Sequence, residues 1–85
     1  MDRINDLSSS IIGAAIEVHR ELGPGLLESA YERCFARELS LRGIAFQQQK
    51  SLPVHYKGTQ LDCGYRLDFL IADTIVVEVK AVDAL

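Results

Sequence analysis

The chain has 85 residues, enough for one small domain with a thin margin of stability, and its 48% hydrophobic and 25% charged residues are typical of a globular protein. Nine basic and twelve acidic residues give a net charge of −3, which argues against a broad basic surface for nucleic acid but leaves room for a local patch. No run approaches the roughly 18 apolar residues of a membrane helix, and two widely separated cysteines, Cys34 and Cys63, predict free thiols in a reducing cytoplasm.

The first helix is predicted over about residues 5–22, where apolar residues recur at intervals of three and four. Gly23 suits the left-handed position that follows a helix, and Pro24 cannot continue the helical hydrogen-bond ladder. The predicted inner face consists of Leu7, Ile11, Ala14, Ala15, Val18 and Leu22.

The second helix is predicted from Gly25 or Leu26 to about Arg42, and Gly43 is a natural terminator. Its inner face is expected to contain Leu27, Ala30, Tyr31, Cys34, Phe35 and Leu41.

An acid near the start of this second helix has two possible roles. With Gly25 as the N-cap, Glu28 would occupy the third helical position, where it can bond back to the cap and oppose the helix dipole. The alternative is a functional carboxylate. Tyr31 lies one turn later on the same face, where it could pack in the core or hold Glu28 or a metal-bound water in position.

From Ile44 onward the spacing of apolar residues changes to two, which predicts three strands. They cover about residues 44–58, with a disturbance at Pro53, then 59–73 and 74–82. The predicted turns are Lys57-Gly58 and residues 72–74. The order is therefore two N-terminal helices and a three-stranded antiparallel meander, an α+β fold.

Three charged side chains, Asp68, Glu78 and Lys80, interrupt the apolar sequence of the last two strands, although burying charges is costly unless they pair or bind something. If residues 72–74 form a three-residue loop, Asp68 stands opposite Glu78, with Lys80 on the same face. A two-residue loop would separate the acids. The first register is favoured because it collects six apolar side chains on the other face: Leu67, Phe69, Ile71, Ile75, Val77 and Val79.

Two opposed carboxylates repel each other. The neighbouring Lys80 could compensate for the repulsion, and a divalent cation would do so better. Asp and Glu oxygens suit Mg²⁺ or Mn²⁺, which keep several waters and take one or two carboxylates. A lysine beside such an ion could orient or deprotonate an attacking water and stabilise charge on a phosphate. The pattern predicts metal-dependent hydrolysis of a phosphodiester. The alternative is a solvated strand face, because Glu-x-Lys is common on strands.

The segment GLLESAY, from Gly25 to Tyr31, lies between AAIEVHRELGP and YRLDFLIADTIVVEVKAV, and together these resemble the GxxExxY proteins of the PD-(D/E)XK nuclease superfamily. That family is mainly bacterial, and the resemblance covers residues 11–82. It implies a restriction-endonuclease-like core and a nucleic-acid substrate, DNA or RNA. The site residues it implies are Asp68 and Glu78 at the metal, the backbone carbonyl of Val79 as a further ligand, Lys80 at the water, Glu28 as an additional acid and Tyr31 in support.

Members of that family usually continue past the third strand through another helix and strand. Residues 1–85 are therefore expected to form a single, incomplete domain whose apolar sheet face lies uncovered. We expect a missing C-terminal segment or a homodimer to cover that face. The alternative to a nuclease is a catalytically inactive module that dimerises through the same face.

Overall fold

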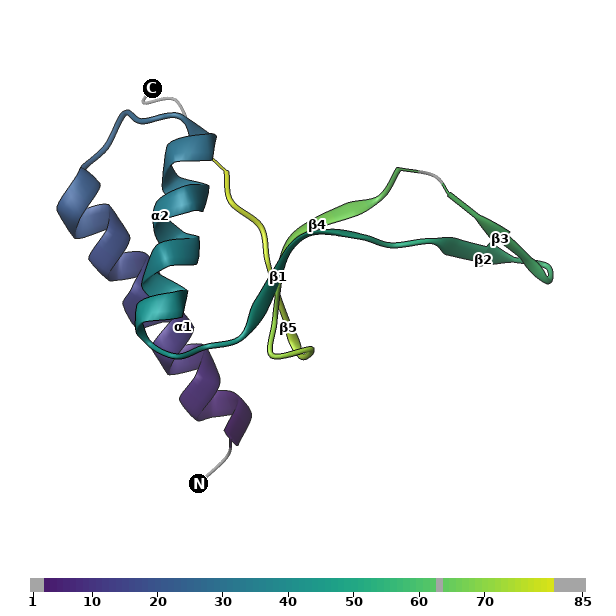
Figure 1. Cartoon of the computed structure of the whole chain (residues 1–85), viewed down its shortest axis with the longest axis horizontal. Coiled ribbons are helices and arrows are strands. Elements are labelled where there is room, and N and C mark those ends of the chain that lie inside the picture. The colour runs from purple at the N-terminus through teal and green to yellow at the C-terminus, as the bar shows by residue number, and fades with distance from the viewer. Residues whose placement is uncertain (1–2, 63, 81–85) are drawn as a thin grey trace. The chain divides into compact units, whose positions relative to one another are not determined.

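The structure is a computed structural model that describes residues 3–62 and 64–80. The predicted α+β order, two helices followed by antiparallel strands, is confirmed (Figure 1). The chain divides into a helical unit, which contains the described residues up to Ala45 together with Val79 and Lys80, and a strand unit, Phe46–Glu78. The elements are α1 (Arg3–Leu22), α2 (Glu28–Leu41), β1 (Phe46–Ser51), β2 (Val54–Tyr56), β3 (Thr59–Leu61), β4 (Arg66–Ile71) and β5 (Ile75–Val77).

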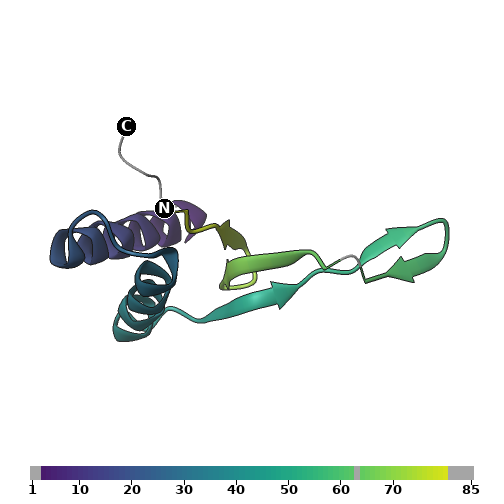
Figure 2. The same cartoon turned by 90° about the horizontal axis from the view of Figure 1, so that it is seen from above.

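α1 lies beside α2 in the helical unit (Figure 2). It follows the predicted apolar stripe except at Ala15, which was expected inside and is exposed. Ile11, Ala14 and Val18, spaced by three and four, are buried. The helix ends as expected at Gly23, which has a left-handed φ of +72° and whose N–H donates to the His19 carbonyl at 2.8 Å.

α2 begins at Glu28, later than the sequence suggested. Gly25 has a φ of +89°, which a right-handed helix cannot contain, so Gly25 lies in the connecting loop. Leu27 is the N-cap residue, and Glu28 is the first helical residue rather than the third.

Two leucines predicted on the inner face of α2 are exposed, and a different leucine is buried. Phe35 and Leu39 are buried, and Leu39 has no exposed surface. Leu27 and Leu41, both expected inside, are 77% and 62% exposed. Leu39 and Leu41 are separated by about 200° around the helix axis, so only one of them can face α1.

α2 ends at Leu41, and Gly43, the residue after the C-cap Arg42, has a left-handed φ of +71°. The Gly43 N–H donates to the Ser40 carbonyl and the Ile44 N–H to the Leu39 carbonyl, both at 3.0 Å. This pair of bonds is common where a glycine closes a helix, because it satisfies carbonyls that the last turn leaves without partners.

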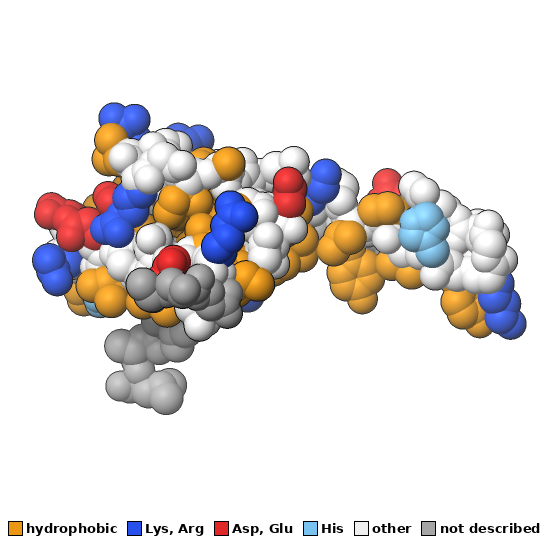
Figure 3. All heavy atoms as spheres, turned by 90° about the horizontal axis from the view of Figure 1, so that it is seen from below, with side chains coloured by type: hydrophobic (Ala, Val, Ile, Leu, Met, Phe, Trp, Pro, Cys, Tyr) orange, Lys and Arg blue, Asp and Glu red, His pale blue; other side chains and the backbone are white. Residues whose placement is uncertain are grey.

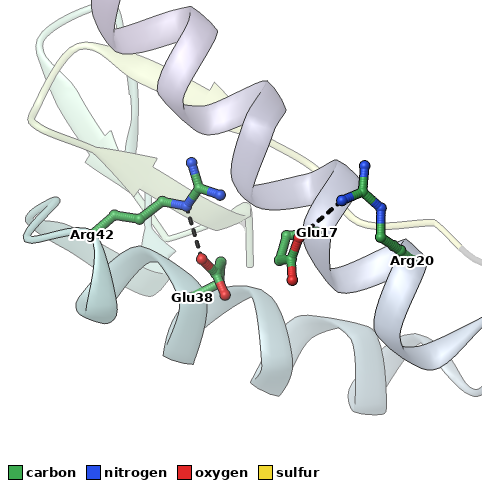
Figure 4. Close-up of polar contacts among 4 residues, drawn as sticks. All are labelled: Glu17, Arg20, Glu38 and Arg42. Carbon is green, nitrogen blue, oxygen red and sulfur yellow. Dashed lines mark hydrogen bonds and ion pairs between the residues drawn. The ribbon is translucent and has the colours of Figure 1, made fainter.

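Two ion pairs lie on the helices (Figure 4). Arg42 Nε donates to Glu38 Oε2 at 2.8 Å, and Arg20 Nη1 lies 3.6 Å from Glu17 Oε2. The second pair is exposed and contributes little to stability. A Cβ atom at Gly13 of α1 would come within 3.0 Å of Arg42 Nη1, so the missing side chain makes room for the arginine between the helices.

β1, β4 and β5 form an antiparallel sheet in the order β1-β4-β5. The predicted register is confirmed, because Ile71 pairs with Ile75 and Phe69 with Val77. Thr74 closes the loop by donating its N–H to the Ile71 carbonyl at 3.0 Å.

β2 and β3 form a two-stranded hairpin that extends from the end of β1 and β4 (Figures 1 and 2). The strand predicted over residues 44–58 is thus divided near Pro53, the site of the expected disturbance. Lys57 and Gly58 have φ values of +48° and +79° between the paired residues Tyr56 and Thr59. This is the expected two-residue turn, whose twist matches that of the strands.

The apolar face of the sheet is buried most completely at its centre. Phe69 and Ile71 have no exposed surface, and the Phe46 ring packs near that of Phe69, with centroids 5.8 Å apart. The flanking side chains of Leu67, Ile75 and Val77 are half-buried. A homodimer through this face stays a prediction.

Candidate active site

The two acids predicted to share a metal ion lie at the same end of the β4–β5 pair. Asp68 directly precedes Phe69, and Glu78 directly follows Val77, with which Phe69 pairs. One further step of the same register places Asp68 opposite Glu78, just beyond the last pair of the ladder. Asp68 is half-buried and Glu78 is exposed. The fold thus brings together the two backbone positions on which the metal prediction depends.

The residue of β1 that stands opposite Asp68 has an unusual backbone conformation. The register of β1 with β4 places Gln49 opposite Asp68 by count, and Gln49 has a φ of +52°. A left-handed conformation costs a residue other than glycine about 1–2 kcal/mol. Strain of this kind is concentrated at functional sites in proteins, so its location beside the candidate acid agrees with a functional role for this part of the sheet.

The residues after β5 do not continue the strand in the described part of the chain. β5 ends at Val77, whereas the sequence predicted a strand to residue 82; residues 81 and 82 lie outside the described residues. Pairing stops where the apolar run gives way to charged residues, which gain nothing from burial. Val79 is half-buried and Lys80 is exposed, and both belong to the helical unit.

Glu28 and Tyr31 belong to the loop and helix of the GxxExxY segment in the helical unit. Glu28 is the first residue of α2, where a negative charge is favoured by the helix dipole. The Tyr31 hydroxyl donates a hydrogen bond to the Gly23 carbonyl. Together with the left-handed Gly25, this bond fixes the α1–α2 connection that carries Glu28. The sequence did not indicate this contact, because it joins residues eight positions apart through a loop.

We expect Tyr31→Phe to lower the free energy of unfolding by about 1 kcal/mol, because it removes one partly buried hydrogen bond and little else. Urea unfolding followed by circular dichroism would measure the change. Tyr56→Phe is the matched control: Tyr56 is 60% exposed, and its loss of a hydroxyl should leave the unfolding midpoint unchanged. Equal effects of the two substitutions would contradict a structural role for the Tyr31 hydroxyl.

The donor set at the strand end suits a hydrated ion. Among residues 3–62 and 64–80, no three His, Cys, Asp or Glu side chains gather closely enough to hold a metal ion between them. Asp68 and Glu78 offer two carboxylates. Mg²⁺ typically binds proteins through one or two carboxylates and keeps several waters. The residues present therefore fit Mg²⁺ or Mn²⁺ better than Zn²⁺, which requires three or four protein ligands.

Comparison with known families defines the class of protein. A family model described as the PD-(D/E)XK nuclease superfamily matches residues 5–85, a range that includes both units. The chain belongs to this superfamily, as the sequence predicted, and nuclease-like function follows from that membership. Nucleases of this superfamily generally use divalent metal ions. The narrower resemblance to the GxxExxY proteins stays a prediction.

No curated protein and no solved structure matches the chain.

Two further predictions concern the cysteines and the lack of a membrane-spanning helix. Cys34 is a free, half-buried thiol, and Cys63 lies outside the described residues. Neither described helix combines the length and apolar character needed to cross a membrane.

Proposed function

We propose that this protein hydrolyses phosphodiester bonds of nucleic acid with the help of Mg²⁺ or Mn²⁺. One observation supports the proposal most directly: in a chain of the PD-(D/E)XK nuclease superfamily, the register of β4 with β5, continued by one residue beyond the pair Phe69–Val77, puts Asp68 opposite Glu78. That arrangement supports a shared ion, because like charges at opposed positions are unfavourable and a divalent cation would relieve their repulsion.

In the proposed reaction, Asp68 and Glu78 hold the ion through their carboxylates, and Val79 adds its backbone carbonyl. A bound divalent ion polarises the scissile phosphate and makes a bound water more acidic. The Lys80 ammonium group would orient the attacking water and offset charge on the phosphate. Only its neutral amine form would accept the water's proton. Glu28 is proposed as a further acid of the site, with Tyr31 in support.

Metal-dependent stabilisation tests the proposed ion site. Titrating Mn²⁺ or Mg²⁺ should raise the melting temperature of the wild type by several degrees, because a ligand at 100 times its dissociation constant stabilises the native state by about 2.7 kcal/mol. Asp68→Asn should lose this increase, since it removes one of the two charges that hold the ion. Differential scanning fluorimetry across a range of metal concentrations would measure both.

Asp73→Asn is the matched control, because it makes the same charge change in an exposed turn of the same strand pair. It should respond to metal as the wild type does. An equal increase in wild type and Asp68→Asn would place the ion elsewhere, and the absence of any increase with either metal would count against the proposed site.

A further inference from the structure

Several large apolar side chains are exposed on the hairpin formed by β2 and β3 and on the residues at the base of this hairpin. We call this the hairpin arm and define it as residues 52–62, 64 and 65. The Leu52 N–H donates to the Tyr65 carbonyl at 2.9 Å, which closes its base, and Lys57-Gly58 forms its tip. Its large apolar residues are between 41% and 65% exposed: Leu52, Tyr56, Leu61 and Tyr65.

Figure 3 shows hydrophobic side chains at the surface of this arm and a basic side chain at its tip. An isolated two-stranded hairpin is only marginally stable in water. The register of the hairpin puts Tyr56 and Leu61 on the same face. Large apolar side chains exposed together in this way favour a role in binding, because exposed apolar patches mark interaction sites.

The charge of the arm and its flanking strands favours a polyanion as the partner. Residues 46–71 contain three basic residues, Lys50, Lys57 and Arg66, and two acids, Asp62 and Asp68, whereas the rest of the chain contains six basic and ten acidic residues. All three basic side chains are exposed. A nucleic-acid strand, which carries one negative charge per phosphate, complements these basic side chains, whereas a second copy of the chain carries the same basic side chains at the same positions.

The tip combines an aromatic ring with an ammonium group. Lys57 Nζ lies 5.3 Å from the centre of the Tyr56 ring, a cation–π contact that positions the charge beside the ring. Tyr56 is 60% exposed even so. Proteins that bind single strands use this combination, in which a base stacks on the ring and the neighbouring phosphate meets the cation. Bases paired in a duplex are already stacked and cannot use such a ring.

We propose that the hairpin arm binds an unpaired stretch of nucleic acid, with a base stacked on Tyr56 and phosphates at Lys57 and Arg66. Arg66 is two residues before Asp68 on β4, so a strand held at the base of the arm lies next to the candidate acid. This inference rests on the proposed function, because it names the form of the substrate. It predicts a preference for single strands over duplexes.

Fluorescence anisotropy with a labelled oligothymidylate, and with the same strand paired to oligoadenylate, tests the inference. Excess EDTA prevents metal-dependent cleavage, so binding is measured alone. The wild type should bind the single strand more tightly than the duplex. Tyr56→Ala should weaken single-strand binding roughly 5- to 100-fold, as expected for the loss of one stacked base, and Tyr56→Phe should retain it because the ring remains.

Lys57→Gln provides an independent measurement. Removing one phosphate contact should make the slope of log K against log salt concentration shallower by about 0.7. Arg33→Gln makes the same charge change at an exposed position of α2 and should leave the slope as in the wild type. Melting temperatures should not change in the Tyr56 and Lys57 variants, because both side chains are exposed.

Three results would overturn the inference: equal binding by wild type and Tyr56→Ala, tighter binding of the duplex, or no binding of the oligonucleotide.

Sedimentation velocity tests the competing explanation, in which the arm binds a second copy of the chain. A wild-type dimer that Tyr56→Ala dissociates, without oligonucleotide binding, would assign the arm to a second copy of the chain. Asp68→Asn separates the two proposals, because it should lower cleavage by about two to three orders of magnitude but keep single-strand binding in EDTA. Binding without cleavage in the wild type would contradict the nuclease proposal alone.

Discussion

Asp68→Asn is expected to lower metal-dependent cleavage of a nucleic-acid substrate by about two to three orders of magnitude, the scale on which loss of one group that stabilises transition-state charge lowers a rate. Asparagine keeps the size of aspartate and one carbonyl oxygen, but it removes the charge that would hold the cation. Initial rates with a labelled single-stranded substrate in Mg²⁺ or Mn²⁺ would measure the loss. Asp73→Asn, in the exposed turn, should keep the wild-type rate.

Lys80→Met tests the proposed catalytic step separately from metal binding. The substitution removes the ammonium group and keeps a long side chain, so the rate should fall about as much as in Asp68→Asn. The increase in melting temperature with metal should persist, because Lys80 is proposed to act on water and not to ligate the ion. A rate within twofold of wild type for either variant would refute the role given to that residue.

The sequence predicted the strand pairing at the candidate site for a physical reason. Register in an antiparallel pair is set by side-chain alternation and loop length, and both are local. The positions of Phe69, Ile71 and Ile75 therefore followed from counting residues, and the pairing of Ile71 with Ile75 confirmed the three-residue loop. The extent of β5 did not follow, because the alternation continues to Lys80 although the ladder ends at Val77.

The buried residues of a helix were harder to predict where they depend on how that helix packs against another helix. Periodicity identified a stripe on α2, but the choice between Leu39 and Leu41 depends on how α2 meets α1, which spacing within one helix does not contain. The start of α2 was also missed. Gly25 can serve as an N-cap or as a left-handed loop residue, and the sequence alone does not distinguish these two roles.

The net charge of −3 describes the whole chain and does not say where along it the basic and acidic residues lie. Three basic residues, Lys50, Lys57 and Arg66, fall on β1, the hairpin arm and the start of β4, and their side chains are exposed. Reading the sequence as alternating strands treated Tyr56 and Lys57 as an ordinary strand end and turn. Only the hairpin geometry shows the ring exposed with the ammonium group beside it.

Leu39→Ala is expected to lower the free energy of unfolding by about 2–5 kcal/mol, the range for truncating a fully buried leucine. Leu39 has no exposed surface, and the substitution removes its packing and leaves a cavity. A small domain has a total stability of only about 5–15 kcal/mol, so the loss is a large part of it. Urea unfolding followed by far-ultraviolet circular dichroism would measure it, provided the slope with denaturant is unchanged.

Leu41→Ala is the internal control, because it makes the same chemical change on the same helix two residues away. Leu41 is 62% exposed, and exposed substitutions change stability by about 0.5 kcal/mol or less. The helical preference of the two replacements is identical, so it cancels in the comparison. A difference of less than about 1 kcal/mol between the variants would mean that α2 packs against α1 through a different face, since 200° of rotation separates the two side chains.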